Sequence, residues 1–221
     1  MKAKLISFAF FIAILARGQD LPKFMGRQVT VITSELDDLG FPKGPASVCI
    51  EGPPQRQCYT APEDFGAFPT VEVIQVQKDI PALLFSASSG GVSGYETYFA
   101  LLRSGTDKDL DNLFVSALSL SNQSQIAFWN DSTISDEPIV LTADAAAGPN
   151  EVHYGEHRYE ISAYVRRHDD VLDLYYFLED RYMTAQKYDL ENADILNSEK
   201  PDILARLRRA KSFEPKSPDA R

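Results

Sequence analysis

The stretches HRYEISAYVRR (157–167) and VLDLYYFLE (171–179) decide the fold class of this chain. In the first stretch polar and apolar residues alternate, which places Tyr159, Ile161 and Ala163 on one face of a strand. The second stretch has the same period, and its expected apolar face consists of Leu172, Leu174, Tyr176 and Leu178. Because only the short polar link HDD separates the two, the pair predicts an antiparallel β-hairpin.

Further strand-like stretches lie on the N-terminal side of this hairpin. Each is bounded by Asp, Asn, Ser, Gly or Pro, and they occupy residues 27–35, 70–77, 81–88, 95–103, 112–120, 125–129 and 138–143. The run PALLFSAS (81–88) suits a strand buried on both faces, with 95–103 as its hairpin partner, and 181–188 is expected to continue the sheet after a bend. The pattern predicts a mainly β domain over residues 19–190, either an antiparallel β-sandwich or a barrel-like sheet.

The C-terminal part changes character and predicts a helical segment at residues 191–212, followed by a disordered tail at 213–221. Ser-Glu-Lys-Pro at 198–201 is typical of a helix start, with Pro201 in the first turn. An apolar stripe is then followed by basic residues in the last turn, Arg206, Arg208, Arg209 and Lys211. We expect a helix that covers the sheet, with a basic docking helix as the alternative.

The N-terminus predicts a secretory signal peptide at residues 1–18. Lys2 and Lys4 precede the apolar run LISFAFFIAILA (5–16), and small residues flank a cleavage site before Gln19. The run is shorter than the roughly 20 apolar residues of a membrane span, so no stable membrane anchor is expected. A buried core helix is the alternative, but the flanking pattern favours a secreted or periplasmic protein.

Composition narrows the class of partner. A hydrophobic share of 44% and an aromatic share of 11% provide for a substantial core, so we expect a folded monomer. The net charge of −10 repels phosphate backbones, which makes nucleic acid an unsuitable partner.

Cys49 and Cys58 are the only two cysteines. In an exported chain they predict one disulfide, which would close a loop containing the turn-forming residues Gly52-Pro53-Pro54. A redox pair or a metal site is the alternative, but the CxxC spacing that favours either is absent.

Two clusters of potential metal ligands are present in the sequence. Glu151, His153 and His157 would align on one face of a strand, and two imidazoles with a carboxylate suit zinc, although Gly155 makes the stretch loop-like. Alternating carboxylates at residues 107–111 are typical of calcium loops but lack the EF-hand spacing. We expect no cofactor, with zinc or calcium as alternatives.

Tyrosines are dense between residues 154 and 188. Tyr154, Tyr164 and Tyr175 are candidates for contacts with a protein or carbohydrate ligand, because tyrosine combines an apolar ring with a polar hydroxyl. Filling of a sandwich core is the alternative role.

Segments from Cys49 onward resemble a family of exported bacterial proteins of unknown function. The segments are VCIEGPPQRQCYT (48–60), LLFSASSGGVSGYETYFALLR (83–103), LSNQSQIAFW (120–129), HRYEISAYV (157–165) and DRYMTAQKYD (180–189). The resemblance implies export and an all-β fold, and it implies no reaction and no functional residue.

The sequence therefore predicts an exported, non-enzymatic binding or interaction module. No nucleophile, phosphate-binding or dinucleotide-binding motif is present. The alternative function is that of a hydrolase or metal-dependent enzyme built on Glu151, His153 and His157.

Overall fold

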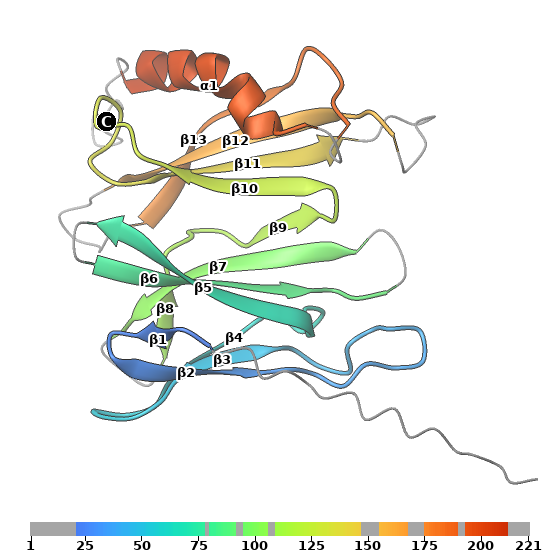
Figure 1. The fold of residues 1–221 in the computed structure, drawn as a ribbon, viewed down its shortest axis with the longest axis vertical. Coiled ribbons are helices and arrows are strands. Elements are labelled where there is room, and N and C mark those ends of the chain that lie inside the picture. The colour runs from blue at the N-terminus through green and yellow to red at the C-terminus, as the bar shows by residue number, and fades with distance from the viewer. Residues whose placement is uncertain are drawn as a thin grey trace, which may run out of the picture.

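The computed structural model describes residues 21–77, 80–91, 95–105, 109–146, 155–167, 175–189 and 193–211. These residues form three antiparallel sheets and a C-terminal helix, stacked as four layers (Figure 1). The mainly β prediction is confirmed. The barrel-like alternative is wrong, because each described sheet is open and strands near in sequence pair within their own sheet.

The layers follow the order of the chain. The first sheet contains β1 (Lys23–Phe24), β2 (Arg27–Ile32), β3 (Ser47–Ile50) and β4 (Gln57–Thr60). The second contains β5 (Ala67–Gln77), β6 (Ile80–Ser88), β7 (Glu96–Ser104), β8 (Leu110–Asn112) and β9 (Leu118–Ser121). The third contains β10 (Ser124–Trp129), β11 (Ile139–Ala146), β12 (Arg158–Arg167) and β13 (Tyr175–Met183), and helix α1 (Ile195–Lys211) covers it.

Three apolar cores join the layers. Strand β6 explains how the middle sheet serves two of them: Leu83 and Phe85 are buried against the first sheet, and Ala82 is buried toward the third. The prediction of a strand buried on both faces is confirmed, as is its pairing with β7, where Phe85 lies opposite Ala100. Alternation along an apolar strand thus holds three sheets together.

The predicted antiparallel pairing of β12 and β13 is confirmed, but its bounds differ from the prediction. Arg167 lies opposite Tyr175, and β13 runs without a break to Met183, so residues 181–183 belong to the same strand. Tyr159, Ile161 and Ala163 are buried together under α1. Tyr176 is also buried, but Leu178 is 47% exposed. The predicted apolar face is therefore only partly buried, because β13 is the edge strand of its sheet and has a strand neighbour on one side only. Leu172 and Leu174 lie outside the described residues.

The prediction of one strand at 112–120 is wrong, since two short strands, β8 and β9, occupy this region. The Asn112 side chain explains the break. Its Oδ1 accepts hydrogen bonds from the backbone N–H groups of Leu101 (3.2 Å) and Phe114 (3.1 Å), which turns the chain after β8.

Helix α1 begins at Ile195, earlier than predicted, so Pro201 lies inside the helix and not in its first turn. Gln125 of β10 accepts hydrogen bonds from the N–H groups of Ile195 (3.0 Å) and Leu196 (3.2 Å). Asp194 accepts one from Asn197 at 3.1 Å. These bonds satisfy the first free N–H groups of the helix, and a cap from another strand is not visible in the local sequence.

The expectation that the helix covers the sheet is confirmed by its buried residues Ile195, Leu196, Ile203 and Leu207. Two of its basic residues have partners within the chain, since Arg208 pairs with Asp131 at 3.1 Å and Arg206 lies 3.9 Å from Asp180. None of the helical structure in the described ranges combines the length and apolarity that spanning a bilayer requires.

Candidate binding cleft

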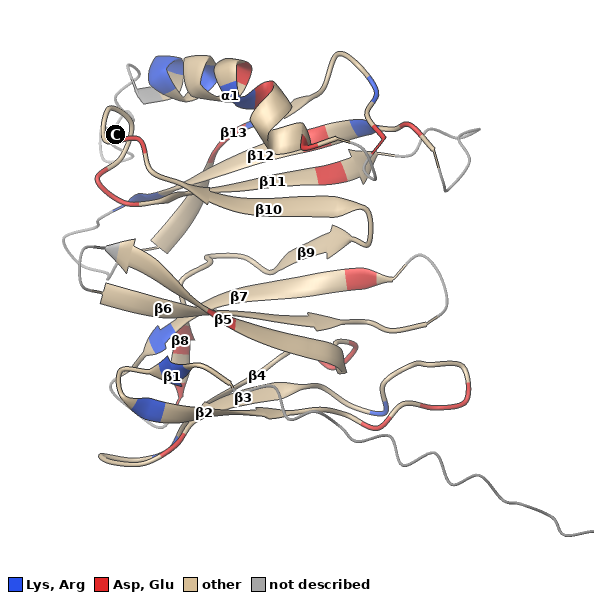
Figure 2. Cartoon of the chain, viewed as in Figure 1, with Lys and Arg blue, Asp and Glu red and all other residues tan. Residues whose placement is uncertain are grey.

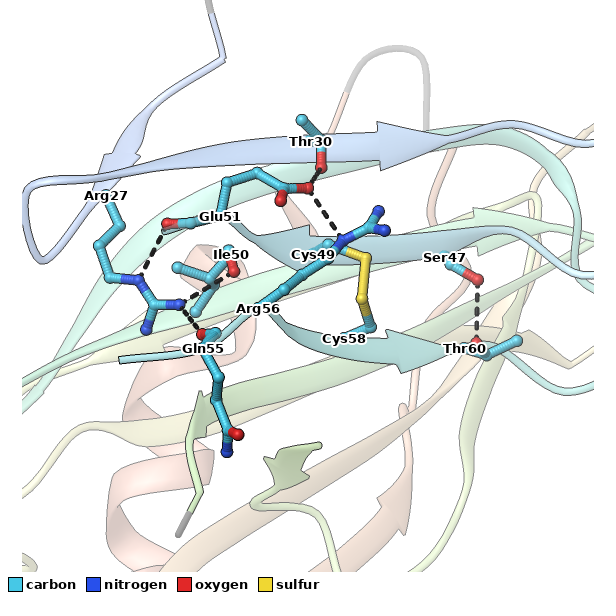
Figure 3. Close-up of a disulfide and its surroundings, with 10 residues drawn as sticks. All are labelled: Arg27, Thr30, Ser47, Cys49, Ile50, Glu51, Gln55, Arg56, Cys58 and Thr60. Carbon is cyan, nitrogen blue, oxygen red and sulfur yellow. Dashed lines mark hydrogen bonds and ion pairs between the residues drawn. A yellow bond between two sulfur atoms is a disulfide. The ribbon is translucent and has the colours of Figure 1, made fainter. Parts of the chain in front are cut away.

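The predicted disulfide is present. Cys49 of β3 and Cys58 of β4 lie directly opposite each other, with their Cα atoms 4.1 Å apart (Figure 3). The bond lies on the outer face of the first sheet, since the alternate residues Val48 and Ile50 point into the core.

Arg27 holds the loop that the disulfide closes. Its Nε donates to the carbonyl of Glu51 at 3.0 Å, and its Nη2 donates to those of Ile50 (3.0 Å) and Gln55 (Figure 3). Nη2 also donates to the carbonyl of Gly52 at 3.1 Å. One guanidinium thus satisfies carbonyl groups that a short loop could not pair within itself. The disulfide and the hydrogen bonds of Arg27 therefore hold the loop between β3 and β4 in place.

The metal hypotheses fall largely outside the described residues, which include neither Glu151 nor His153. His157 is 2% exposed, and its backbone pairs with that of Tyr188 in both directions, at 3.0 and 2.8 Å. Asp111 of the predicted calcium loop lies 3.9 Å from Arg103. Over the ranges that the structure describes, no three His, Cys, Asp or Glu side chains are grouped to hold a metal ion.

Of the three candidate tyrosines, the structure describes Tyr164 and Tyr175, which differ in their surroundings. Tyr154 lies outside the described residues, and Tyr175 is partly buried opposite Arg167. Tyr164 packs against the core between the second and third sheets, and burial raises the pKa of its hydroxyl. A ligand-binding role for these tyrosines stays a prediction.

The structure points to a different site, a cleft of about 630 Å³ at one side of the first two sheets. Three segments far apart in sequence line it: the loop between β2 and β3, the segment before β5, and the ends of β6 and β7. The lining residues are Phe41, Pro42, Lys43, Gly44, Glu63, Asp64, Phe65, Ser89 and Glu96.

The loop between β2 and β3 is held in a defined shape. Asp37 Oδ1 accepts hydrogen bonds from the N–H groups of Leu39 and Phe41, both at 2.9 Å. The N–H of Lys43 donates to the carbonyl of Glu35 at 2.8 Å. This arrangement keeps two large apolar side chains in solvent, with Leu39 67% and Phe41 48% exposed.

Two glycines allow this loop to lie against the second sheet. A Cβ at Gly66 would be 1.9 Å from the carbonyl oxygen of Gly44, and one at Gly90 would be 2.4 Å from that of Gly40. Because such contacts are too short for any side chain, both positions need glycine. The cleft is therefore built into the packing of the loop.

The lining of the cleft carries more acidic than basic residues, and Figure 2 shows Asp or Glu in the loop between β2 and β3 and at one end of β7. Of the lining residues, Glu63, Asp64 and Glu96 are acidic and Lys43 is basic. The charge of Lys43 is offset by Glu35, 3.3 Å away. Glu96 accepts a hydrogen bond from Ser119 at 3.0 Å, whereas the described residues provide no hydrogen bond or ion pair to the carboxylates of Glu63 and Asp64.

The sequence did not single out this site. The signal was present in the turn-rich stretch LDDLGFPKGP (36–45), where apolar residues lie between turn formers. The sequence does not show that Glu63, Asp64 and Glu96 line the same cleft as this loop. Their proximity depends on how the first and second sheets pack against each other.

Comparisons of the chain with models of protein families, with curated proteins and with solved structures found no match.

Proposed function

We propose that this protein is an exported, non-enzymatic binding module and that its ligand contacts the cleft beside the loop between β2 and β3. The disulfide is compatible with an oxidising compartment, which agrees with the predicted signal peptide. Recovery of a mature chain that begins at Gln19, measured by mass spectrometry of the protein from its host, would support export, and an intact Met1 would contradict it.

The observation that carries the proposal is the exposure of Leu39 and Phe41 on a loop whose backbone is held by Asp37. Large apolar side chains on a loop whose backbone is already held contribute contact area at a lower ordering cost on binding than those on a loop that must first become ordered. A cleft of about 630 Å³ next to them is within the usual range of roughly 300–1,000 Å³ for ligand sites.

A panel of neutral, acidic and basic peptides together with oligosaccharides tests the proposal. Binding followed by NMR should perturb the amide signals of the residues that line the cleft. Phe41→Ser should weaken binding of any member by about tenfold, which corresponds to loss of a buried aromatic contact.

Phe177→Ser is the matched control, because Phe177 is 39% exposed on β13 of the third sheet. It should leave binding unchanged. The proposal is wrong if no panel member binds, or if the perturbed signals lie away from the cleft.

A further inference from the structure

We infer that the cleft recognises an arginine side chain on a protein partner. This inference names the ligand chemistry of the site and rests on the proposed function. Two properties of the cleft carry it, namely the pairing of aromatic rings with carboxylates and the sign of its charge.

The cleft offers both surfaces that a guanidinium uses. Phe41 lines it with a 48% exposed side chain, and Phe65 lines it with a ring that is partly buried against Tyr98, with ring centroids 5.5 Å apart. Glu63 and Asp64 follow each other directly before Phe65. A guanidinium is planar, is weakly hydrated, and can stack on an aromatic ring while its N–H groups donate to carboxylates. An ammonium group is a compact and strongly hydrated charge that gains less from such a site.

The charge balance of the cleft favours a cation. Glu63, Asp64 and Glu96 outnumber Lys43, the basic residue of the lining, and Lys43 is already paired with Glu35 at 3.3 Å. Asp37, which lies nearby in sequence, uses its Oδ1 to hold the loop. The carboxylates of Glu63 and Asp64 have no bond of this kind from the described residues, and both residues are exposed.

A protein segment fits better than a free amine, because the exposed apolar residues extend beyond the cleft. Leu39, two residues before Phe41, is 67% exposed, and Phe68, three residues after Phe65 at the irregular start of β5, is 69% exposed, so both are available to contact the chain that carries the arginine. Interfaces that hold an arginine among aromatic anchors are typical of protein recognition.

The test uses four fluorescent peptides that are identical except at one central residue, which is arginine, lysine, citrulline or glutamate. Fluorescence anisotropy with the full mature chain should give the tightest binding for arginine. Citrulline keeps the shape of arginine but has no charge, so we expect binding at least about tenfold weaker, the effect of losing a charge-assisted contact.

The matched variants remove two charges each. Glu63→Gln with Asp64→Asn should weaken binding of the arginine peptide by about tenfold or more and leave the citrulline peptide unchanged. Asp136→Asn with Glu156→Gln removes two exposed charges from the third-sheet half of the molecule and should have little effect. Thermal unfolding of both double variants checks that they remain folded.

Distinct results would overturn the inference. Equal binding of the arginine and citrulline peptides, or no effect of the Glu63 and Asp64 substitutions, rejects it. If neutral ligands still bind and Phe41→Ser abolishes that binding, the proposed function survives alone. Self-association of the protein that the same double variant removes would assign the cleft to a second copy of the chain, and it would also reject the inference.

Discussion

The first and third sheets differ in what covers the face that points away from the second sheet. The third sheet has apolar residues on both faces, so α1 covers the side that the second sheet does not reach. The first sheet directs Val29, Val48 and Ile50 inward to the core that it shares with the second sheet. Its outer face has the disulfide and the hydroxyl groups of Ser47 and Thr60, which are 2.9 Å apart (Figure 3).

The two sheets therefore differ in what stabilises them. A sheet that is apolar on both faces gains stability from a second cover, because the hydrophobic effect scales with the area removed from water. A short-stranded sheet with one polar face has less apolar area to bury. Here a covalent bond and the contacts of Arg27 supply the missing constraint.

The largest loss of stability is expected where α1 covers the third sheet. Leu207→Ala should lower the free energy of unfolding by about 2–5 kcal/mol, because it leaves a cavity between α1 and the third sheet. Urea unfolding followed by fluorescence of Trp129, the only tryptophan, measures it, since Lys200 Nζ of α1 lies 4.7 Å from the centre of the indole ring. Asp202→Asn in the same helix is exposed and should change stability by less than about 0.5 kcal/mol. Equal effects of the two changes would mean that α1 contributes little.

At the uncovered layer, removal of the disulfide should have the next largest effect. Cys49→Ser with Cys58→Ser should cost about 2–3 kcal/mol by the chain-entropy account, which ties the effect to the short length of the closed loop. Urea unfolding of the variant and of the wild type in both redox states measures it. A loss below about 1 kcal/mol would show that the polar contacts alone hold this sheet.

A smaller loss of stability is expected when Arg27 is replaced, and Arg56 in the same loop region serves for comparison. Arg27→Met should cost about 1–2 kcal/mol, because it leaves several loop carbonyls without a donor. Arg56→Met is the control, since Arg56 forms one ion pair with Glu51 at 3.1 Å and its side chain is 53% exposed, so a change of about 0–0.5 kcal/mol is expected. Hydrogen exchange of the loop amides should rise only for Arg27→Met, and a rise in both variants would contradict the assigned role.

The smallest effect is a loss of stability at alkaline pH. Burial, followed by the contact with Glu199, raises the pKa of Tyr188 above its ordinary value of 10.0. Because the folded state favours the neutral hydroxyl, this contribution is complete below pH 10 and is lost as the pH rises toward the folded-state pKa. Stability measured from pH 8 to 11 should fall less steeply in Tyr188→Phe, and an unchanged slope would contradict this account.

The sequence predicted local structure well where one period dominates. The predictions from the alternation in β12, from the two-sided apolar pattern of β6 and from the pair Cys49–Cys58 are each confirmed. These features depend on residues that lie close together in the chain.

Features that depend on distant residues were not predictable in the same way. Whether the strands form one sheet or three depends on which edges pair, and strand period does not report this. The start of α1 depends on Gln125, and the cleft depends on the contact between Gly66 and the loop at Gly44. The predicted site residues followed clusters in the sequence, whereas the cleft joins three separated segments.

The link between Gln125 and the start of α1 has a consequence for the order of folding. The amides of Ile195 and Leu196 find their acceptor on a strand that is synthesised about 70 residues earlier. Helix nucleation is costly, and Pro201 weakens this helix from within, so α1 is stable only once β10 is in place. A nascent chain that has been synthesised only as far as β13 therefore keeps one apolar face of the third sheet uncovered until α1 packs against it.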